Sequence, residues 1–308
     1  MKIAVLGAGA MGRLFAAKLS AANDVLLLVR SQEKAEAVRK VGITVHEQDG
    51  SAFTAHPMAA VAGDWTQSVE LILVFVKSMD TEAALSACRG MIGDTTRILT
   101  LHNGGGHEEV LSQFVPMERV LIGTTQHNAS IRPDGSVFHG GSGHTTIGSP
   151  LGESDAAREV ARAFAAAGLD AAASANVREA VWRKLLTNAS LSALTGVFRS
   201  PMGFVTDSES AWALCEKLIR EAVAVAQADG VHFDVEEKIA EVRAVSVNGP
   251  KGITSICADL THGRLTEVDT ISGSVVHSAR RLGVSAPCHE MTLLLIHAME
   301  DRNRLLGL

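Results

Sequence analysis

The sequence predicts an α/β domain at residues 1–173, followed by an all-α domain at residues 174–308. In residues 2–106, short apolar runs alternate with helix-like segments, which is typical of a parallel sheet with helices on both faces. Residues 119–149 contain several strand-like runs around the turn signal Pro133-Asp134-Gly135. From about residue 175 onward the pattern is helical almost throughout.

The strands of the predicted sheet are short apolar runs, as expected for strands that are buried on both faces. They are "KIAVLG" at residues 2–7, "DVLLLVR" at 24–30, "LILVFVK" at 71–77 and "RILTLHNGGG" at 97–106. A hairpin is also expected within residues 43–59, where two strand-like runs flank the turn signal Asp49-Gly50.

The predicted helices carry start and stop signals. The first helix follows a glycine-rich turn within residues 8–23. The helix after the second strand has Ser31 as its N-cap and Gly42 as its stop. A later helix has Ser154 and Gly168 in the same two positions.

The composition excludes several classes of protein. A net charge of −6 provides no basic field for nucleic acid or an anionic membrane, and no apolar run approaches the ~18 residues of a membrane span. Arg13 and Lys18 interrupt the apolar start of the chain, so no secretory signal is expected. The 12 histidines are scattered without metal-ligand spacing, so no metal site is expected. The four cysteines include no C-x-x-C pair, which is typical of a reducing compartment and predicts a cytoplasmic location.

The glycine-rich turn predicts a cofactor site. Its Gly7-x-Gly9-x-x-Gly12 spacing, between a strand and a helix, is typical of a Rossmann-type dinucleotide-binding domain. The second strand ends in Arg30, where an NAD-binding domain would carry an acidic residue. Because a guanidinium can bind a 2'-phosphate through two hydrogen bonds, the predicted cofactor is NADP. The residues of the turn that are expected to contact it are Gly7, Ala8, Gly9, Ala10, Met11 and Gly12.

The segment "WRKLLTNASLS", residues 182–192, places Lys184, Asn188 and Ser192 at steps of four on a predicted helix. A carbonyl group that accepts a hydride needs a nearby donor and a proton, and a lysine with a lowered pKa can supply both. Asparagine and serine can bind a substrate without adding charge. The alternative is a solvated helix face from which the lysine extends.

Together these motifs resemble the ketopantoate reductase (2-dehydropantoate 2-reductase) family over nearly the whole chain. The motifs, in order, are "GAGAMG", Arg30, Lys77 in "VFVKS", Asn103 in "HNGGG", "GTTQHNA", "WRKLLTN", Ser255 in "TSICADL" and Glu267 in "TEVDTISG". The resemblance implies a Rossmann-type domain followed by a helical domain. It also implies NADPH-dependent reduction of 2-dehydropantoate to (R)-pantoate in pantothenate biosynthesis. The implied partner is a small-molecule 2-keto acid, and a homodimer is the expected assembly.

The resemblance implies roles for the residues that face the substrate. Lys184 corresponds to the general acid of the family. Asn103 corresponds to a residue that contacts both the substrate and the nicotinamide. Asn188 and Ser255 correspond to substrate contacts, and Ser192 lies beside Asn188 in the same row.

Three further residues are matched to the cofactor by the same resemblance. Ala129 and Glu267 correspond to residues that contact the dinucleotide. Lys77 corresponds to a basic residue near the 2'-phosphate of the adenosine.

The chain departs from the family pattern at three positions. Ser192, Met202 and Ser272 stand where the family usually has asparagine. Each change removes an amide that could bind the hydroxyl groups of ketopantoate, so the site is less able to reject other 2-keto acids. The changes at Ser192 and Met202 favour an alternative interpretation, an (R)-2-hydroxyacid dehydrogenase for another branched or aromatic 2-keto acid.

Two more distant alternatives fit the sequence less well. The β-hydroxyacid dehydrogenases combine a similar start with a helical lysine and asparagine, but their S-G-G turn after the cofactor domain has no counterpart in this chain. A regulatory protein that senses NADP without turnover would be compatible with Arg30 and the glycines. It would give no reason for Lys184, Asn188 and Ser255 to occur together.

Overall fold

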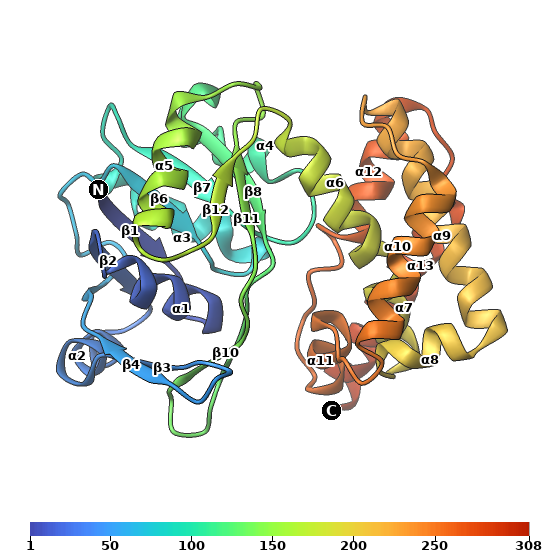
Figure 1. Cartoon of the computed structure of the whole chain (residues 1–308), viewed down its shortest axis with the longest axis horizontal. Coiled ribbons are helices and arrows are strands. Elements are labelled where there is room, and N and C mark those ends of the chain that lie inside the picture. Colours follow the sequence, from blue (N-terminus) through green and yellow to red (C-terminus); the bar gives the residue numbers. More distant parts are fainter. Residues whose placement is uncertain (308) are drawn as a thin grey trace. The chain divides into compact units, whose positions relative to one another are not determined.

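The structure is a computed structural model, and it describes residues 1–307. The chain forms two compact units (Figure 1). Unit 1 consists of Met1–His102 and His107–Ala180, and unit 2 consists of Asn103–Gly106 and the described chain from Val181 onward. The boundary between functional domains that we expect at residues 173 and 174 stays a prediction. Within the described residues, no helix is both long and apolar enough to cross a bilayer.

Unit 1 is built on an eight-stranded sheet with the order β12-β11-β8-β7-β6-β1-β2-β5. All neighbouring strands are parallel except β8 and β11, which are antiparallel. The predicted parallel sheet is therefore confirmed, with one antiparallel pair. The strands are β1 (Lys2–Leu6), β2 (Asp24–Val29), β5 (Met58–Val61), β6 (Leu71–Val74), β7 (Arg97–Thr100), β8 (Val120–Thr125), β11 (Thr145–Gly148) and β12 (Ala171–Ala173).

Helices of unit 1 pack on this sheet and bury its apolar strands. Helix α1 packs on β1 and β2, α2 on β2 and β5, and α5 on β11 and β12. The α-helices are α1 (Ala10–Leu19), α2 (Gln32–Val41), α3 (Thr81–Ala87), α4 (His107–Leu111) and α5 (Asp155–Ala166). The expected N-caps are confirmed, because the Ser31 hydroxyl accepts a hydrogen bond from the amide of Lys34 and the Ser154 hydroxyl accepts one from Ala157.

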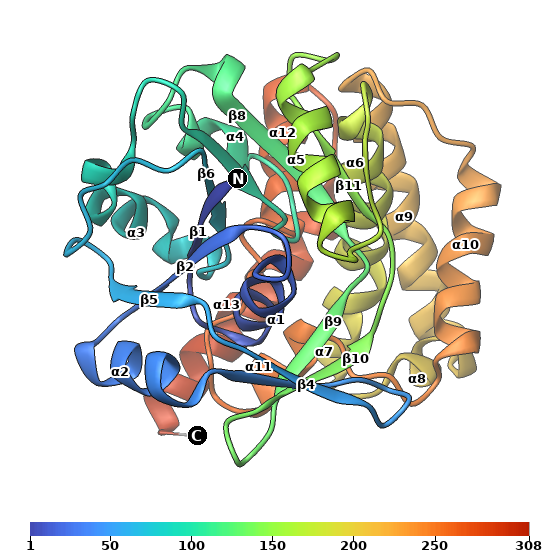
Figure 2. The ribbon, with the colours of Figure 1, turned by 60° about the vertical axis from the view of Figure 1, so that its left-hand side comes forward.

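A second, four-stranded sheet has the order β4-β3-β10-β9 (Figure 2). Its strands are β3 (Ile43–His46), β4 (Ala52–Ala55), β9 (Asn128–Ile131) and β10 (Val137–Gly141). The expected hairpin around Asp49-Gly50 is confirmed, since β3 pairs antiparallel with β4. The strands on either side of the turn at residues 133–135, β9 and β10, also pair antiparallel. The two hairpins join through the parallel pair of β3 and β10, with Val137 opposite Val45.

Unit 2 is helical, as the sequence predicts. Helix α6 (Val177–Thr187) leads into it, and its apolar core includes Leu218, Ile219 and Ile296. The remaining helices are α7 (Ala193–Phe198), α8 (Met202–Asp207), α9 (Glu209–Ala228), α10 (Val235–Asn248), α11 (Ser255–Thr261), α12 (Ser272–Leu282) and α13 (Pro287–Leu306). Between α6 and α7 the chain forms a π-helical turn, η4 (Asn188–Ser192), where the sequence predicted regular helix.

Candidate functional site

The glycine-rich turn at Gly7–Gly12, which we call the fingerprint turn, joins β1 to α1, and its three glycines have different structural roles. Gly7 has φ +114°, and a Cβ there would lie 2.6 Å from the amide nitrogen of Val76. A Cβ on Gly12 would lie 1.8 Å from the carbonyl oxygen of Gly7. A Cβ on Gly9 would meet no atom within 4 Å. Gly7 and Gly12 are thus required by the turn itself, whereas the surface at Gly9 is open to a ligand.

A pocket of about 690 Å³ lies beside this turn, within the range typical of small-molecule sites. Most of the charged side chains that line it are cationic, and Asp80 is the one carboxylate among the described lining residues. The charged residues of the lining are Arg13, Arg30, Lys34, Lys77 and Asp80. The open face at Gly9, the helix N-terminus at Ala10 and these cations fit a dinucleotide that carries an additional phosphate.

Arg30 lies at the end of β2 and pairs with Asp80, which ends the 3₁₀ turn η1 (Ser78–Asp80). Arg30 Nη2 is 2.9 Å from Asp80 Oδ2, and the two side chains are 80% and 47% exposed. Asp80 was missed in the sequence because 50 residues separate it from Arg30. The positions of Arg30 and Lys77 in this pocket agree with the expected cofactor roles, and those roles stay predictions.

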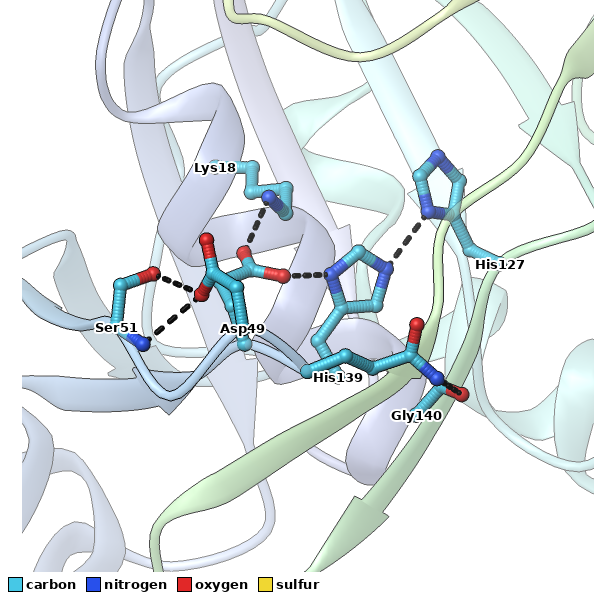
Figure 3. Close-up of polar contacts among 8 residues, drawn as sticks. Lys18, Asp49, Ser51, His127, His139 and Gly140 are labelled. Atoms are coloured by element: carbon cyan, nitrogen blue, oxygen red, sulfur yellow. Dashed lines mark hydrogen bonds and ion pairs between the residues drawn. The ribbon is translucent and has the colours of Figure 1, made fainter.

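A partly buried chain of polar side chains ties α1 to the second sheet (Figure 3). Lys18 Nζ, on α1, is 2.7 Å from Glu47 Oε1, and Glu47 Oε2 is 2.5 Å from His139 Nδ1. His139 Nε2 is in turn 2.9 Å from His127 Nδ1. Because a carboxylate only accepts, His139 Nδ1 must donate to Glu47. We refer to Lys18, Glu47, His139 and His127 as the polar chain.

The charges of the polar chain follow from its burial and its contacts. Burial would raise the pKa of Glu47, but hydrogen bonds from Lys18 and His139 hold it below its ordinary value. Burial, with the nearby His139 and Lys18, lowers the pKa of His127 to about 4, so this imidazole is neutral at neutral pH. His139 pairs with Ala129 across β9 and β10. The polar chain therefore fixes Ala129, an expected cofactor contact, relative to the fingerprint helix.

Lys184 lies near the end of α6 in unit 2. Burial lowers its pKa from 10.5 to about 8, and the neighbouring charge of Glu267 opposes part of that change. A fully solvated lysine would keep its ordinary pKa, so the partial burial of Lys184 favours the substrate-facing interpretation, and its role as proton donor stays a prediction. Lys184 can give up a proton near neutral pH more readily than a surface lysine.

The π-helical turn after α6 carries Asn188 and Ser192. Ser192 is buried, and its hydroxyl lies 3.4 Å from the side-chain oxygen of Asn188, to which it donates. The carbonyl oxygen of Ser192 accepts hydrogen bonds from Thr195 at 2.8 Å and Thr254 at 3.4 Å. Since Thr254 is also the N-cap of α11, these contacts bring Ser255, the exposed first residue of α11, close to the π-helical turn.

The loop that carries Asn103 belongs to unit 2, although the chain on both sides of it belongs to unit 1. The amide of Gly105 donates to the carbonyl oxygen of Thr270 at 2.9 Å, and Thr270 Oγ1 donates to the carbonyl oxygen of Asn103 at 3.3 Å. Thr270 also donates through its amide to the carbonyl oxygen of Glu267. These hydrogen bonds hold the Asn103 loop beside the Glu267–Thr270 segment of unit 2.

Two of the three departures from the family pattern serve the packing of unit 2. Met202 begins α8, and its Cε would lie 2.4 Å from a Cβ on Gly252, so its side chain lies against the Gly249–Gly252 loop. Ser272 begins α12 and is fully buried. Its hydroxyl has no hydrogen-bond partner among the described residues.

The residues expected at the site fall into two sets, one in each unit. Unit 1 holds the fingerprint turn (Gly7–Gly12) with Arg30, Lys77 and Ala129. Unit 2 holds Asn103, Lys184, Asn188, Ser192, Ser255 and Glu267. Asn103 and Glu267 thus belong to unit 2, whereas the other residues that are expected to contact the cofactor belong to unit 1. No cluster of three or more His, Cys, Asp or Glu side chains in the described chain could hold a metal ion.

Comparison with known proteins covers almost the whole chain. The family described as ketopantoate reductase PanE/ApbA matches residues 3–152, and its C-terminal counterpart matches residues 176–300. A 2-dehydropantoate 2-reductase of Halobacterium salinarum is 34% identical over 290 residues, which are 93% of this chain and 95% of the relative. A 2-dehydropantoate 2-reductase of Streptococcus pyogenes is 31% identical over 303 residues, 97% of this chain and 98% of the relative.

Two solved structures are similar over nearly their whole length. A D-mandelate dehydrogenase with NADH and anilino(oxo)acetate has a TM-score of 0.90 at 30% identity, with 98% of this chain and 99% of that chain covered. A PanE/ApbA family ketopantoate reductase from Ralstonia eutropha has a TM-score of 0.89 at 27% identity, with 99% and 100% covered. The fold predicted from the sequence is confirmed by these similarities.

Proposed function

Because the chain belongs to the ketopantoate reductase PanE/ApbA family, we propose that it is an NADP-dependent oxidoreductase that reduces 2-dehydropantoate to (R)-pantoate. The relatives in Halobacterium and Streptococcus carry this activity in their names. The observation that carries the proposal is a partly buried lysine, Lys184, whose pKa is lowered to about 8, in a chain with a cationic fingerprint pocket.

The cofactor when bound supplies the hydride. The residues of the fingerprint turn would hold its pyrophosphate at the N-terminus of α1, where the open face of Gly9 allows close approach. Arg30 and Lys77 would bind the 2'-phosphate, and Ala129 would line the site from β9. Asn103 and Glu267 stay expected cofactor contacts on the family resemblance.

The residues of unit 2 would bind the keto acid and move the proton. Lys184 would donate a hydrogen bond to the keto oxygen, stabilise the charge that develops there, and deliver the proton. The hydroxyl of Ser192 donates to the Asn188 side-chain oxygen, so the amide nitrogen of Asn188 is left to donate to a substrate oxygen. Ser255, at the start of α11, would supply a further hydroxyl.

A turnover assay tests this proposal. The oxidation of NADPH is followed with a panel of 2-keto acids that includes ketopantoate, 2-ketoisovalerate and phenylglyoxylate. Ketopantoate should give the highest kcat/KM. An absence of turnover with every acid, in a folded protein that binds NADPH, would leave only a cofactor-binding protein and refute the proposal.

A second candidate function is an (R)-2-hydroxyacid dehydrogenase for an aromatic 2-keto acid. The similarity to a D-mandelate dehydrogenase, with a TM-score of 0.90, supports it. So do the departures at Ser192 and Met202, which remove amides from the family pattern. In the panel, a kcat/KM for phenylglyoxylate above that for ketopantoate would replace the first assignment with this one.

The setting of the enzyme and its assembly are also predictions. The four cysteines are free thiols, which suits a reducing compartment such as the cytoplasm. A homodimer is expected to appear in sedimentation velocity as a species of twice the chain mass.

A further inference from the structure

The phosphate end of the cofactor pocket contains an acidic side chain among its cations. Asp80 lines the pocket together with Arg30, Lys34 and Lys77. A carboxylate at this end is unexpected in a site for a phosphorylated ribose, because like charges repel. The geometry of Asp80 gives it a specific partner.

Asp80 is placed by the turn that follows β6. Its amide donates to the carbonyl oxygen of Lys77 at 2.9 Å, which closes the turn, and α3 begins at the next residue. An aspartate at a helix start usually accepts a hydrogen bond from the first turn of the helix. The carboxylate of Asp80 makes no such bond and instead lies 2.9 Å from the guanidinium of Arg30.

Because Arg30 is paired with Asp80, its guanidinium must break this ion pair before it can bind a phosphate. Arg30 follows β2 and Asp80 follows β6, and these strands are the two neighbours of β1 in the sheet. Both residues therefore extend from the carboxyl edge of the sheet, where the fingerprint turn also lies. A bound 2'-phosphate, with a charge between about −1.5 and −2, would compete with Asp80 for the guanidinium.

We propose that Asp80 is a determinant of cofactor specificity, which lowers the preference of this pocket for NADPH over NADH. With NADPH, Arg30 must leave Asp80, and the carboxylate then remains near the phosphate. With NADH, the ion pair stays intact and the carboxylate can accept a hydrogen bond from a ribose hydroxyl. The inference rests on the proposed function, because it assumes that a nicotinamide dinucleotide is the ligand of the pocket.

Direct binding tests the inference without catalysis. The dissociation constants of NADPH and NADH are measured by fluorescence titration for the wild type and for Asp80→Asn. Asp64→Asn is the matched control, because Asp64 is an exposed carboxylate that bonds Gln32 at 2.6 Å and does not line the pocket. In Asp80→Asn the ratio of the NADH to the NADPH dissociation constant should rise about 3- to 10-fold, the range for an exposed ion pair and a nearby like charge.

Two further measurements tie the effect to charge and to Arg30. The rise in the ratio should shrink at high salt, because exposed charges are screened. It should also be smaller in an Arg30→Ala background, where the carboxylate has no guanidinium to hold. Asp80→Ser, which keeps a side chain able to cap α3, should reproduce the rise if the asparagine variant is unstable.

The possible outcomes separate this inference from the proposed function. A ratio that is unchanged in both Asp80 variants overturns the inference. A ratio that falls also overturns it, since Asp80 would then position Arg30 for the phosphate. Failure of the wild type to bind either dinucleotide would refute the proposed function itself, and with it the role of Asp80.

Discussion

Replacement of Lys184 by methionine removes the proposed proton donor while it keeps the length of the side chain. Burial lowers the pKa of Lys184 from 10.5 to about 8. At 1.36 kcal/mol per pH unit, the folded protein disfavours the ammonium form by roughly 3 kcal/mol. Lys184→Met should therefore leave the melting temperature unchanged or raise it. General acid catalysis contributes about 10²- to 10⁴-fold, and kcat should fall by this factor.

The pH profile gives an independent reading of the same residue. The acid must be protonated before it can act, so kcat/KM for keto-acid reduction should fall as the pH rises through about 8. Between pH 7 and pH 9 the fall should be about tenfold, whereas a lysine of ordinary pKa near 10.4 would give almost none. Glu267 raises the pKa of Lys184, so Glu267→Gln should move the midpoint to lower pH.

Arg183→Met is the matched control for this experiment. Arg183 is the neighbouring residue on α6, and its guanidinium pairs with Glu241 at 2.6 Å. It should keep nearly the wild-type kcat. The reasoning fails if Lys184→Met retains more than about a tenth of the wild-type kcat. A wild-type profile that is flat from pH 7 to pH 9 would refute it as well.

Three other predictions test the remaining parts of the site. In NADPH titrations and thermal melts, Gly9→Ala should weaken NADPH binding and keep the wild-type melting temperature. In thermal melts, Gly12→Ala should unfold or strongly destabilise unit 1. Ser192→Asn should raise kcat/KM for ketopantoate by a few-fold, which corresponds to about one added hydrogen bond to the substrate. It should not raise kcat/KM for 2-ketoisovalerate. A lower kcat/KM for ketopantoate with an unchanged value for 2-ketoisovalerate would favour the dehydrogenase alternative. Glu47→Gln should destabilise the protein at neutral pH by about 1–3 kcal/mol in urea unfolding, more than Asp49→Asn on the same hairpin. Because the pKa of Glu47 is lowered in the folded state, its stabilisation should be lost as the pH falls through that lowered pKa, and a difference independent of pH would contradict this account.

Local patterns were sufficient to predict most of unit 1. Buried apolar runs identified β1, β2, β6 and β7, and Ser31 and Ser154 identified two helix starts, because these signals depend only on neighbouring residues. The second sheet was not predicted as a separate body. Its parallel pair of β3 and β10 joins segments about 90 residues apart, and no local pattern encodes such a register.

The parts of the site that were missed depend on contacts between distant segments. The ion pair of Arg30 and Asp80 joins two strand ends that are 50 residues apart. The π-helical turn over Asn188–Ser192 has no composition of its own, and it lies where the Ser190 hydroxyl donates to the carbonyl oxygen of Leu186 at 2.6 Å. Contacts of this kind appear only when the helices are packed together.

The three departures from the family pattern differ in how closely their contacts connect them to the expected substrate residues. Met202 lies against the Gly249–Gly252 loop, and Ser272 is fully buried, so an amide at either position would first have to be accommodated by the packing of unit 2. Ser192 alone of the three bonds to a residue expected to bind substrate, Asn188. A longer amide at 192 would change both the space beside Asn188 and the direction of its side chain. The choice between ketopantoate and another 2-keto acid should therefore depend on position 192 more than on 202 or 272.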